Sequence, residues 1–241
     1  MAPTVVLLHG FTQTRRSWRR TVQALGGRYR ALAPDLPGHG QSAHRVASFD
    51  ACTAYVRALA PPRFSLAGYS MGGRVALHAA LALRDRLEQL VLIGASPGLA
   101  EATERAARRA ADDALADRIE AIGVEAFARE WAAQPLFAGQ PERVAAAAHA
   151  DRLRNTAEGL AAALRGLGTG AMDPLWDRLP ELTIPVTLLV GERDEKFRAI
   201  AERMAARLPD ARLTIVPGAG HAAHLERPEV VAQLVAAGVR R

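Results

Sequence analysis

Short apolar runs alternate with longer stretches of helical periodicity over most of the chain. The runs lack the apolar–polar alternation of a half-exposed strand, so each is expected to be a strand buried on both faces. Parallel strands joined by helices produce this pattern. Six strands are predicted, at residues 5–8, 29–33, 64–67, 90–93, 186–190 and 212–216.

Helices are predicted between these strands, and several carry start or stop signals. Ser48 is a suitable N-cap, Gly26-Gly27 and Pro61-Pro62 end the segments that precede them, and Pro228 occupies a permitted first-turn position. The pattern therefore favours an α/β protein with a mostly parallel central sheet and helices on both faces. The predicted helices cover residues 17–25, 48–59, 71–83, 195–208 and 228–237.

The alternation stops after residue 100. Residues 101–170 are rich in Ala, Arg, Glu and Leu, with helical periodicity and no convincing strand. Breaks are expected at Gly123, at 134–135, at 139–141 and at 166–170. We expect residues 1–100 and 171–241 to form the core domain, and residues 101–170 to be an inserted helical cap over the carboxyl edge of the sheet. His9, Ser70, Ser96 and Asp194 are predicted to lie at that edge.

The composition is typical of a globular protein and does not by itself indicate a function. The chain has 241 residues, 49% hydrophobic and 23% charged, as in a globular protein. Its net charge of +6 comes from scattered arginines, with Lys196 as the only lysine, so we expect no nucleic-acid partner. Cys52 is the single cysteine and is expected to pack in a helix. Neither a signal peptide nor a membrane-spanning run is recognised, which favours a cytoplasmic location without membrane association.

The stretch Gly68-Tyr69-Ser70-Met71-Gly72 matches the G-x-S-x-G pattern between a predicted strand and a predicted helix. This context is that of a nucleophile elbow, in which a sharp turn exposes the serine hydroxyl at the start of a helix. The elbow requires an acid after a late strand and then a histidine after the last strand. Asp194 and His221 meet both requirements in chain order, so Ser70, Asp194 and His221 are the predicted catalytic residues.

Neighbouring residues offer alternatives to this assignment. Glu192 and Glu195 flank the same turn as Asp194, whose shorter side chain suits a closer approach to histidine. His224 competes with His221 and is expected to pack or hydrogen-bond locally. Two backbone amides, those of Phe11 and Met71, are expected to form the oxyanion hole.

His9, Asp35 and His39 lie in loops, where we expect them to brace the backbone. The seven histidines are dispersed, and no metal-ligand spacing is found.

Five segments together resemble the α/β-hydrolase superfamily and, within it, the 2-succinyl-6-hydroxy-2,4-cyclohexadiene-1-carboxylate synthases of bacterial menaquinone biosynthesis. Superfamily patterns alone discriminate little; Tyr69, Arg74, Trp131 and the Asp-x-Lys-Phe ending at Phe197 carry the narrower resemblance. The segments are Leu-His-Gly-Phe (8–11), Asp-Leu-Pro-Gly-His-Gly (35–40), Gly-Tyr-Ser-Met-Gly-Gly-Arg (68–74), Gly-Glu-Arg-Asp-Glu-Lys-Phe (191–197) and Gly-His-Ala-Ala-His-Leu-Glu (220–226).

The resemblance implies an α/β-hydrolase fold and a lyase activity. Such an enzyme eliminates pyruvate from 2-succinyl-5-enolpyruvyl-6-hydroxy-3-cyclohexene-1-carboxylate by triad-assisted proton abstraction, and no cofactor is implied. The substrate is a small tricarboxylate. By resemblance, Arg74, Arg108 and Arg152 bind its carboxylates, while Tyr69 and Trp131 line its pocket. Arg154 lies two residues from Arg152, and the sequence leaves open which of the two faces the pocket.

Two other functions remain open from the sequence. A serine carboxylesterase or thioesterase would use the same triad as a nucleophile, and would favour apolar side chains over arginines around its pocket. A non-catalytic binding protein would not need all three triad residues. For the oligomeric state we expect a monomer or a weak homo-oligomer.

Overall fold

The computed structural model describes residues 2–237. Its centre is one sheet of six parallel strands in the order β2-β1-β3-β4-β5-β6. The predicted fold class is confirmed. The register joins Leu8 to Gly68 and Gly68 to Leu92, so the loops after β1, β3 and β4 leave the same edge. The strands are β1 Thr4–Leu8, β2 Arg30–Leu32, β3 Phe64–Tyr69, β4 Leu87–Ile93, β5 Val186–Gly191 and β6 Ala211–Val216.

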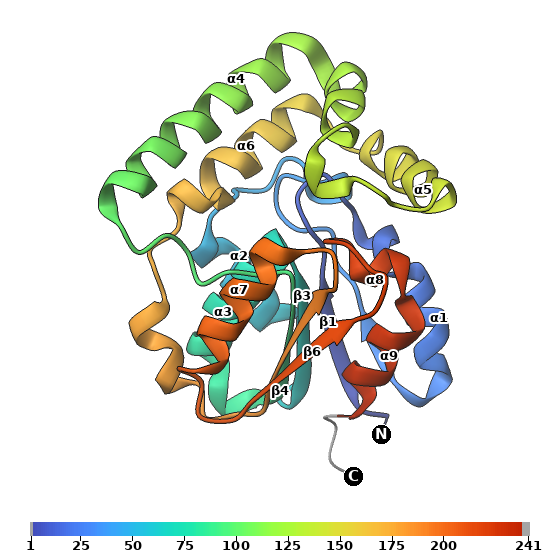
Figure 1. Cartoon of the computed structure of the whole chain (residues 1–241), viewed down its shortest axis with the longest axis vertical. Coiled ribbons are helices and arrows are strands. Elements are labelled where there is room, and N and C mark those ends of the chain that lie inside the picture. Colours follow the sequence, from blue (N-terminus) through green and yellow to red (C-terminus); the bar gives the residue numbers. More distant parts are fainter. Residues whose placement is uncertain (1, 238–241) are drawn as a thin grey trace.

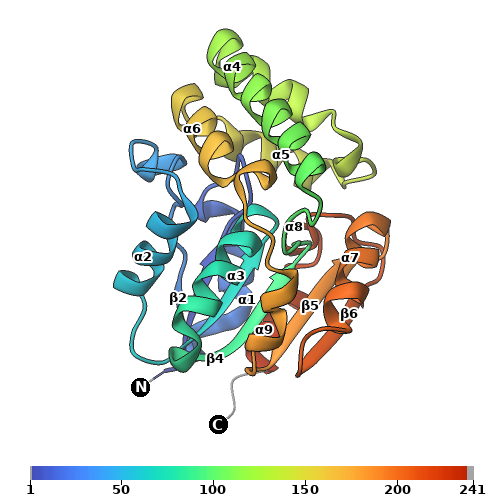
Figure 2. The ribbon, with the colours of Figure 1, turned by 90° about the vertical axis from the view of Figure 1, so that its left-hand side faces the viewer.

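Side chains of successive strand residues enter two separate hydrophobic clusters, because a strand points alternate residues to opposite faces. On β1, Val6 and Leu8 join one cluster, whereas Val5 and Leu7 join the other. Helices α2 Phe49–Leu59, α3 Met71–Leu83 and α7 Glu195–Ala205 cover the first face; α1 Arg19–Leu25 and α9 Pro228–Ala237 cover the second (Figure 2).

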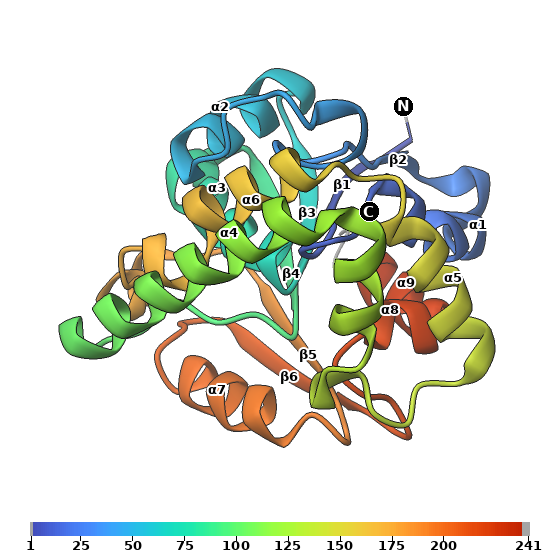
Figure 3. The same ribbon diagram turned by 90° about the horizontal axis from the view of Figure 1, so that it is seen from above.

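Three helices between β4 and β5 lie across the carboxyl edge of the sheet (Figures 1 and 3). They are α4 Ala102–Ala132, α5 Glu142–Arg152 and α6 Ala157–Leu167. A third hydrophobic cluster, which includes Ile119, Phe127 and Leu160, joins α4 to α6. Helix α4 bends at Gly123, where φ is 77°, as the sequence leads one to expect. The division into a core domain and a cap domain at residues 101 and 170 stays a prediction.

Several element boundaries differ from the sequence-based prediction. The break between α5 and α6 was not expected, and it is set by Thr156, whose side chain accepts a hydrogen bond from the Gly159 amide as an N-cap. Helix α7 ends at Ala205, three residues early, and β2 is shorter than predicted at both ends.

A short helix α8 spans Ala223–Glu226. Short 3-10 turns occupy Arg15–Trp18, Gly26–Arg28, Gly40–Ser42, Arg84–Arg86, Pro135–Phe137, Thr169–Ala171 and Trp176–Glu181.

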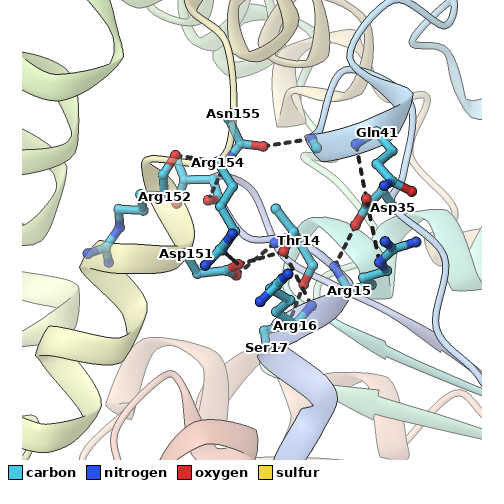
Figure 4. A network of polar contacts seen from close by, with 12 residues as sticks. Thr14, Arg15, Arg16, Ser17, Asp35, Gln41, Asp151, Arg152, Arg154 and Asn155 are labelled. Atoms are coloured by element: carbon cyan, nitrogen blue, oxygen red, sulfur yellow. Dashed lines mark hydrogen bonds and ion pairs between the residues drawn. The ribbon is translucent and has the colours of Figure 1, made fainter.

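Buried polar side chains tie the α5–α6 turn to the loop after β1 (Figure 4). The Asp151 carboxylate accepts from the Thr14 amide at 2.9 Å and from its hydroxyl at 2.5 Å. Asn155 donates from Nδ2 to the Thr12 carbonyl at 2.8 Å and accepts from the Gly40 amide at 3.0 Å. Both side chains are about 95% buried, so these contacts are shielded from water and fix the turn onto the core.

Within residues 2–237, none of the helices combines the length and the apolar character needed to cross a bilayer.

Candidate active site

Ser70 stands at the turn between β3 and α3, in a backbone conformation that side-chain-bearing residues rarely adopt. Its φ is 50° and its ψ is −111°. Such a conformation persists only where the surroundings enforce it, and it often marks a functional position. Gly72 allows the turn, because a Cβ there would collide with the Leu8 and His9 carbonyl groups at the end of β1. The Ser70 hydroxyl is therefore held at the N-terminus of α3, above the carboxyl edge of the sheet.

His221 connects Ser70 to Asp194 through two hydrogen bonds. Its Nε2 lies 3.1 Å from Ser70 Oγ, and its Nδ1 lies 2.7 Å from Asp194 Oδ2. A carboxylate can only accept, so Nδ1 carries the proton and Nε2 is free to accept from the serine hydroxyl. Asp194 follows β5 and His221 follows β6, as the chain order predicts. The structure thus brings together the three residues that the sequence singles out.

The alternative residues are engaged elsewhere. Glu192 accepts a hydrogen bond from the Gly218 amide at 2.8 Å. Glu195 begins α7 and its side chain is exposed. His224 is fully buried, and its Nε2 lies 3.1 Å from Gln13 Oε1. Of the two histidines, His221 is the one in contact with Ser70, and of the three acids, Asp194 is the one in contact with His221.

The peptide between Gly10 and Phe11 has a fixed orientation. The Gly10 carbonyl accepts from the Gln13 amide at 3.2 Å and from His9 Nδ1 at 2.9 Å. His9 Nε2 accepts from the Leu36 amide, so the proton of the neutral ring is on Nδ1. Burial lowers the pKa of His9, which keeps the ring neutral. Since N–H and C=O point in opposite directions across a trans peptide, the Phe11 amide is directed away from His9.

The Phe11 amide donates to no other group within residues 2–237, and the same holds for the Met71 amide. Met71 is the first residue of α3, where an amide has no intrahelical partner. An oxyanion hole requires two free donors, and these two amides come from the loop after β1 and the start of α3, at the same edge of the sheet as Ser70.

Close packing around His221 leaves its ring little freedom. The Phe197 ring centre lies 4.5 Å from that of His221, and the Tyr69 ring centre lies 5.2 Å away. On a further side, Gly94 approaches so closely that a Cβ would lie 2.9 Å from His221 Cε1. Burial raises the pKa of the Tyr69 hydroxyl, and the Asp194 charge adds to this, so Tyr69 stays protonated.

Two charged residues, Arg193 and Glu226, position the His221 loop, although the sequence motifs that contain them indicate no such role. Glu226 accepts hydrogen bonds from the Gly220 amide and forms an ion pair with Arg193 at 2.8 Å. Arg193 also donates to the Gly139 carbonyl of the inserted segment. Glu226 is 3% exposed, so this ion pair has one buried partner. The sequence indicated only that Glu226 belongs to the segment Gly-His-Ala-Ala-His-Leu-Glu. It did not indicate that Arg193 is the partner of Glu226.

A basic cavity of about 350 Å³ lies beside the triad. Phe197, which packs on His221, forms part of its wall, as does Ser96 after β4. Two glutamates, Glu101 and Glu104, also line it. The four basic residues that line the cavity are Arg74, Arg108, Lys196 and Arg203.

Arg74 and Arg108, both predicted to bind substrate, meet at this cavity. Arg74 donates to the Leu167 carbonyl at 2.8 Å, while its buried Nε has no partner among the described residues. Burial lowers the pKa of Arg74 to about 10, and the Arg108 charge contributes. The Arg108 Nε donates to Asp112 at 2.7 Å, which fixes the position of its guanidinium group. Two cations forced together in this way attract an anion.

Arg152 and Trp131 also come from the inserted segment, and both have a buried nitrogen without a partner among residues 2–237. Arg152 is 5% exposed, stacks over the Phe137 ring at 5.2 Å and forms no ion pair within the described chain. Trp131 packs its ring 5.3 Å from that of Phe11. Arg154 is exposed and approaches Asp151 at 3.9 Å. Arg152, rather than Arg154, is thus the buried cation that lacks a counter-charge.

Comparisons with known proteins identify the family to which this fold belongs. The model of the alpha/beta hydrolase family matches residues 5–234. A 2-succinyl-6-hydroxy-2,4-cyclohexadiene-1-carboxylate synthase of Salmonella schwarzengrund (strain CVM19633) is 38% identical over 240 residues, covering 98% of this chain and 93% of the relative. The solved structure of MenH from S. aureus superposes with a TM-score of 0.92 at 33% identity, covering 99% of this chain and 94% of that one.

A thermophilic esterase from Thermogutta terrifontis, solved with malate bound, is a more distant match. Its TM-score is 0.79 at 29% identity, over 98% of this chain and 88% of that one. The synthase and MenH matches therefore exceed it in identity, and MenH also exceeds it in structural agreement. The chain belongs to the α/β-hydrolase family and, within it, to the family of 2-succinyl-6-hydroxy-2,4-cyclohexadiene-1-carboxylate synthases.

Proposed function

We propose that this protein is a carbon–oxygen lyase of menaquinone biosynthesis. It eliminates pyruvate from 2-succinyl-5-enolpyruvyl-6-hydroxy-3-cyclohexene-1-carboxylate to give 2-succinyl-6-hydroxy-2,4-cyclohexadiene-1-carboxylate. The observation that carries the proposal is the hydrogen-bonded Ser70–His221–Asp194 set beside a cavity in which basic side chains outnumber acidic ones. A small-molecule tricarboxylate as substrate and a cytoplasmic location form part of the same proposal.

Proton abstraction begins the reaction. Ser70 Oγ takes the C2 proton next to the succinyl ketone, while its own proton passes to His221 Nε2, 3.1 Å away. Asp194 holds the ring in the tautomer that can accept this proton, and its charge stabilises the imidazolium that results. The role of Ser70 is that of a base, so no acyl-enzyme forms.

Electron movement through the ring then expels the leaving group. The electron pair freed at C2 is held first as an enolate with the succinyl ketone; it then forms the C2–C3 double bond, the C3–C4 π pair moves to C4–C5, and the C5–O bond breaks. Enolpyruvate departs and accepts the proton held by His221, which converts it to pyruvate. As the C2–H bond breaks, negative charge collects on the succinyl ketone oxygen, where the Phe11 and Met71 amides would receive it.

The carboxylates of the substrate would be bound by cations that the fold has left without full neutralisation. Arg74 and Arg108 line the cavity near Ser70, and Arg152 is buried without an ion pair in the described chain. Burying a lone guanidinium is costly, and a carboxylate ligand would offset that cost. Tyr69 and Trp131 would border the ring of the substrate. These five binding roles rest on the resemblance together with this placement.

A direct assay tests the proposal. Purified protein is given the enolpyruvyl substrate, and pyruvate is followed with lactate dehydrogenase and NADH, beside hydrolysis of p-nitrophenyl acetate. We expect rapid pyruvate release that disappears in Ser70→Ala, with little ester cleavage. Rapid, Ser70-dependent ester cleavage without pyruvate above the spontaneous rate would instead establish a carboxylesterase.

A further inference from the structure

A second cleft lies next to the segment that follows the loop after β1. It has a volume of about 400 Å³ and lies between the segment 13–20 and helix α5, with Leu225 of α8 at its base. Neither Ser70, His221 nor Arg74 lines it, so it is separate from the cavity beside the triad. The proposed reaction makes no use of this cleft.

Small side chains on α5 account for the hollow. Val144 and Ala148 are buried at its floor, and Ala147 and Ala150 form its side, so α5 approaches the core without filling the space. Larger aliphatic residues at these positions would occupy the volume. Together with Leu225, these side chains give the cleft a mostly apolar surface, which suits the body of an organic molecule.

Arginines surround this apolar surface on both walls. Arg16, Arg19 and Arg20 come from the core, while Arg143 and Arg154 come from the inserted segment.

The only acid that lines the cleft is Asp151, whose carboxylate is occupied by Thr14 and approached by Arg154 at 3.9 Å (Figure 4). Arg20 pairs with Glu229 at 3.3 Å. Arg16, Arg19 and Arg143 form no ion pair within residues 2–237. The cleft therefore carries net positive charge on two opposite walls.

A buried polar group forms part of the cleft wall. Gln13 is 6% exposed, and its Oε1 is engaged by the Gly10 amide and by His224 Nε2. Its Nε2 has no hydrogen-bond partner within the described chain. The two contacts of Oε1 hold the Gln13 side-chain amide in place. Its Nε2 can therefore donate to an acceptor bound in the cleft.

We propose that this cleft binds a small organic anion that has an apolar, ring-sized body and two acidic groups. The apolar floor would contact the body, and the arginines of the two walls would each take one acidic group in charge-assisted hydrogen bonds. The concave shape and the volume favour a small molecule over the surface of a protein partner.

Isothermal titration with 2,6-naphthalenedicarboxylate tests the proposal on the intact protein. We expect binding that weakens by about tenfold or more in Arg143→Gln, which removes one wall charge, and in Ala147→Phe, which fills the hollow. Two variants serve as matched controls, because neither residue lines the cleft: Ala146→Phe at an exposed position of α5, and Arg129→Gln on α4. Both should bind 2,6-naphthalenedicarboxylate as tightly as the unaltered protein does. Uncharged 2,6-bis(hydroxymethyl)naphthalene should bind much more weakly.

Arg108→Gln separates this cleft from the cavity beside the triad. Binding that survives Arg108→Gln but is lost in Ala147→Phe supports the proposal. Binding that is lost in Arg108→Gln and unchanged in Ala147→Phe would place the anion at the triad and overturn it. Absence of measurable binding in the unaltered protein would also overturn it. Pyruvate release is expected to be unchanged in Ala147→Phe, so the outcome does not depend on the proposed function.

Discussion

Gly94 and His221 are in such close contact that glycine is required at position 94. A Cβ there would lie 2.9 Å from His221 Cε1 and 3.0 Å from Nδ1, and the backbone φ is +52°. We therefore predict that Gly94→Ala displaces the imidazole ring from Ser70 and Asp194. A displacement of about 1 Å can cost about 100-fold in rate, and we expect a fall in kcat of that order.

Gly26→Ala is the matched control for this prediction. Gly26 also has a positive φ, of +64°, but nothing lies within 4 Å of a Cβ built there. Both variants should lose stability through backbone strain, by roughly 1–3 kcal/mol. Only Gly94→Ala should lose turnover, measured as pyruvate release. Equal kcat in the two variants would mean that the ring position does not depend on Gly94.

Ser70 should be dispensable for folding and necessary for turnover. We predict that Ser70→Ala and Ser70→Gly both lower kcat by on the order of 10³-fold or more, because each lacks the hydroxyl. Ser70→Gly should be more stable than Ser70→Ala by about 1 kcal/mol, since glycine adopts a φ of 50° without strain. Thermal unfolding measures the predicted difference in stability, and the pyruvate assay measures the predicted fall in kcat. Turnover near the unaltered rate in either variant would refute the triad assignment.

Arg108 should matter for the tricarboxylate and not for a neutral ester. Because its guanidinium group is fixed by Asp112 at the cavity wall, Arg108→Ala should lower kcat/KM for pyruvate release by roughly 10- to 100-fold. Any hydrolysis of p-nitrophenyl acetate should change little. The exposed Arg129 on the same helix provides the control variant Arg129→Ala. Equal losses on both substrates in Arg108→Ala would remove the argument for carboxylate binding.

Acid should destabilise the fold partly through His39. Burial, with repulsion from His9, lowers the pKa of His39 to about 3, and its Nε2 accepts from the Thr12 amide. The unfolded chain binds a proton at this group below about pH 6.5, whereas the folded chain does not. The contribution of His39 to stability is therefore complete above pH 6.5 and is lost as the pH falls towards 3.

His39→Gln retains an acceptor for the Thr12 amide but cannot be protonated. We predict that it reduces the acid-induced loss of unfolding free energy by up to about 1.4 kcal/mol per pH unit between pH 6 and 4. Urea denaturation at several pH values measures this slope. An unchanged slope would show that His39 is not the group that takes up the proton.

Asn155 should hold the inserted helices onto the core. In Asn155→Asp, a carboxylate would face the Thr12 and Arg152 carbonyls to which Nδ2 now donates. The lost donor and the added repulsion should cost roughly 2–3 kcal/mol. Hydrogen exchange should then speed up in α5 and α6 before it does so in β3. If thermal unfolding and exchange were both unchanged, the turn would not depend on Asn155.

The sequence alone predicted the sheet, the order of its elements and the residues at its carboxyl edge. The reason is local: Ser70, Asp194 and His221 each follow directly after an apolar strand, and parallel strands end at one edge. The choice of Asp194 over Glu192 rested on its shorter side chain, and in the structure Glu192 is held instead by the Gly218 amide.

Contacts across long sequence separations were not predictable in this way. Gln13 meets His224, Asp151 meets Thr14, and nothing in either local sequence indicates the partner. The start of α6 depends on the Thr156 cap, a short signal within an alanine-rich stretch of uniform helix propensity. Whether Arg152 or Arg154 is buried depended on the orientation of α5 against the core.

The inserted helices enter and leave the core between two adjacent strands, β4 and β5, as one continuous stretch. A designer could therefore exchange this stretch for one from a relative and alter the accepted substrate without altering Ser70, His221 or Asp194. Such a chimera would need to retain the contacts that join the stretch to the core, among them Asp151 with Thr14, Asn155 with Thr12 and Arg193 with the Gly139 carbonyl. The part of substrate choice that the inserted helices contribute would then be adjustable separately from the bond-breaking chemistry.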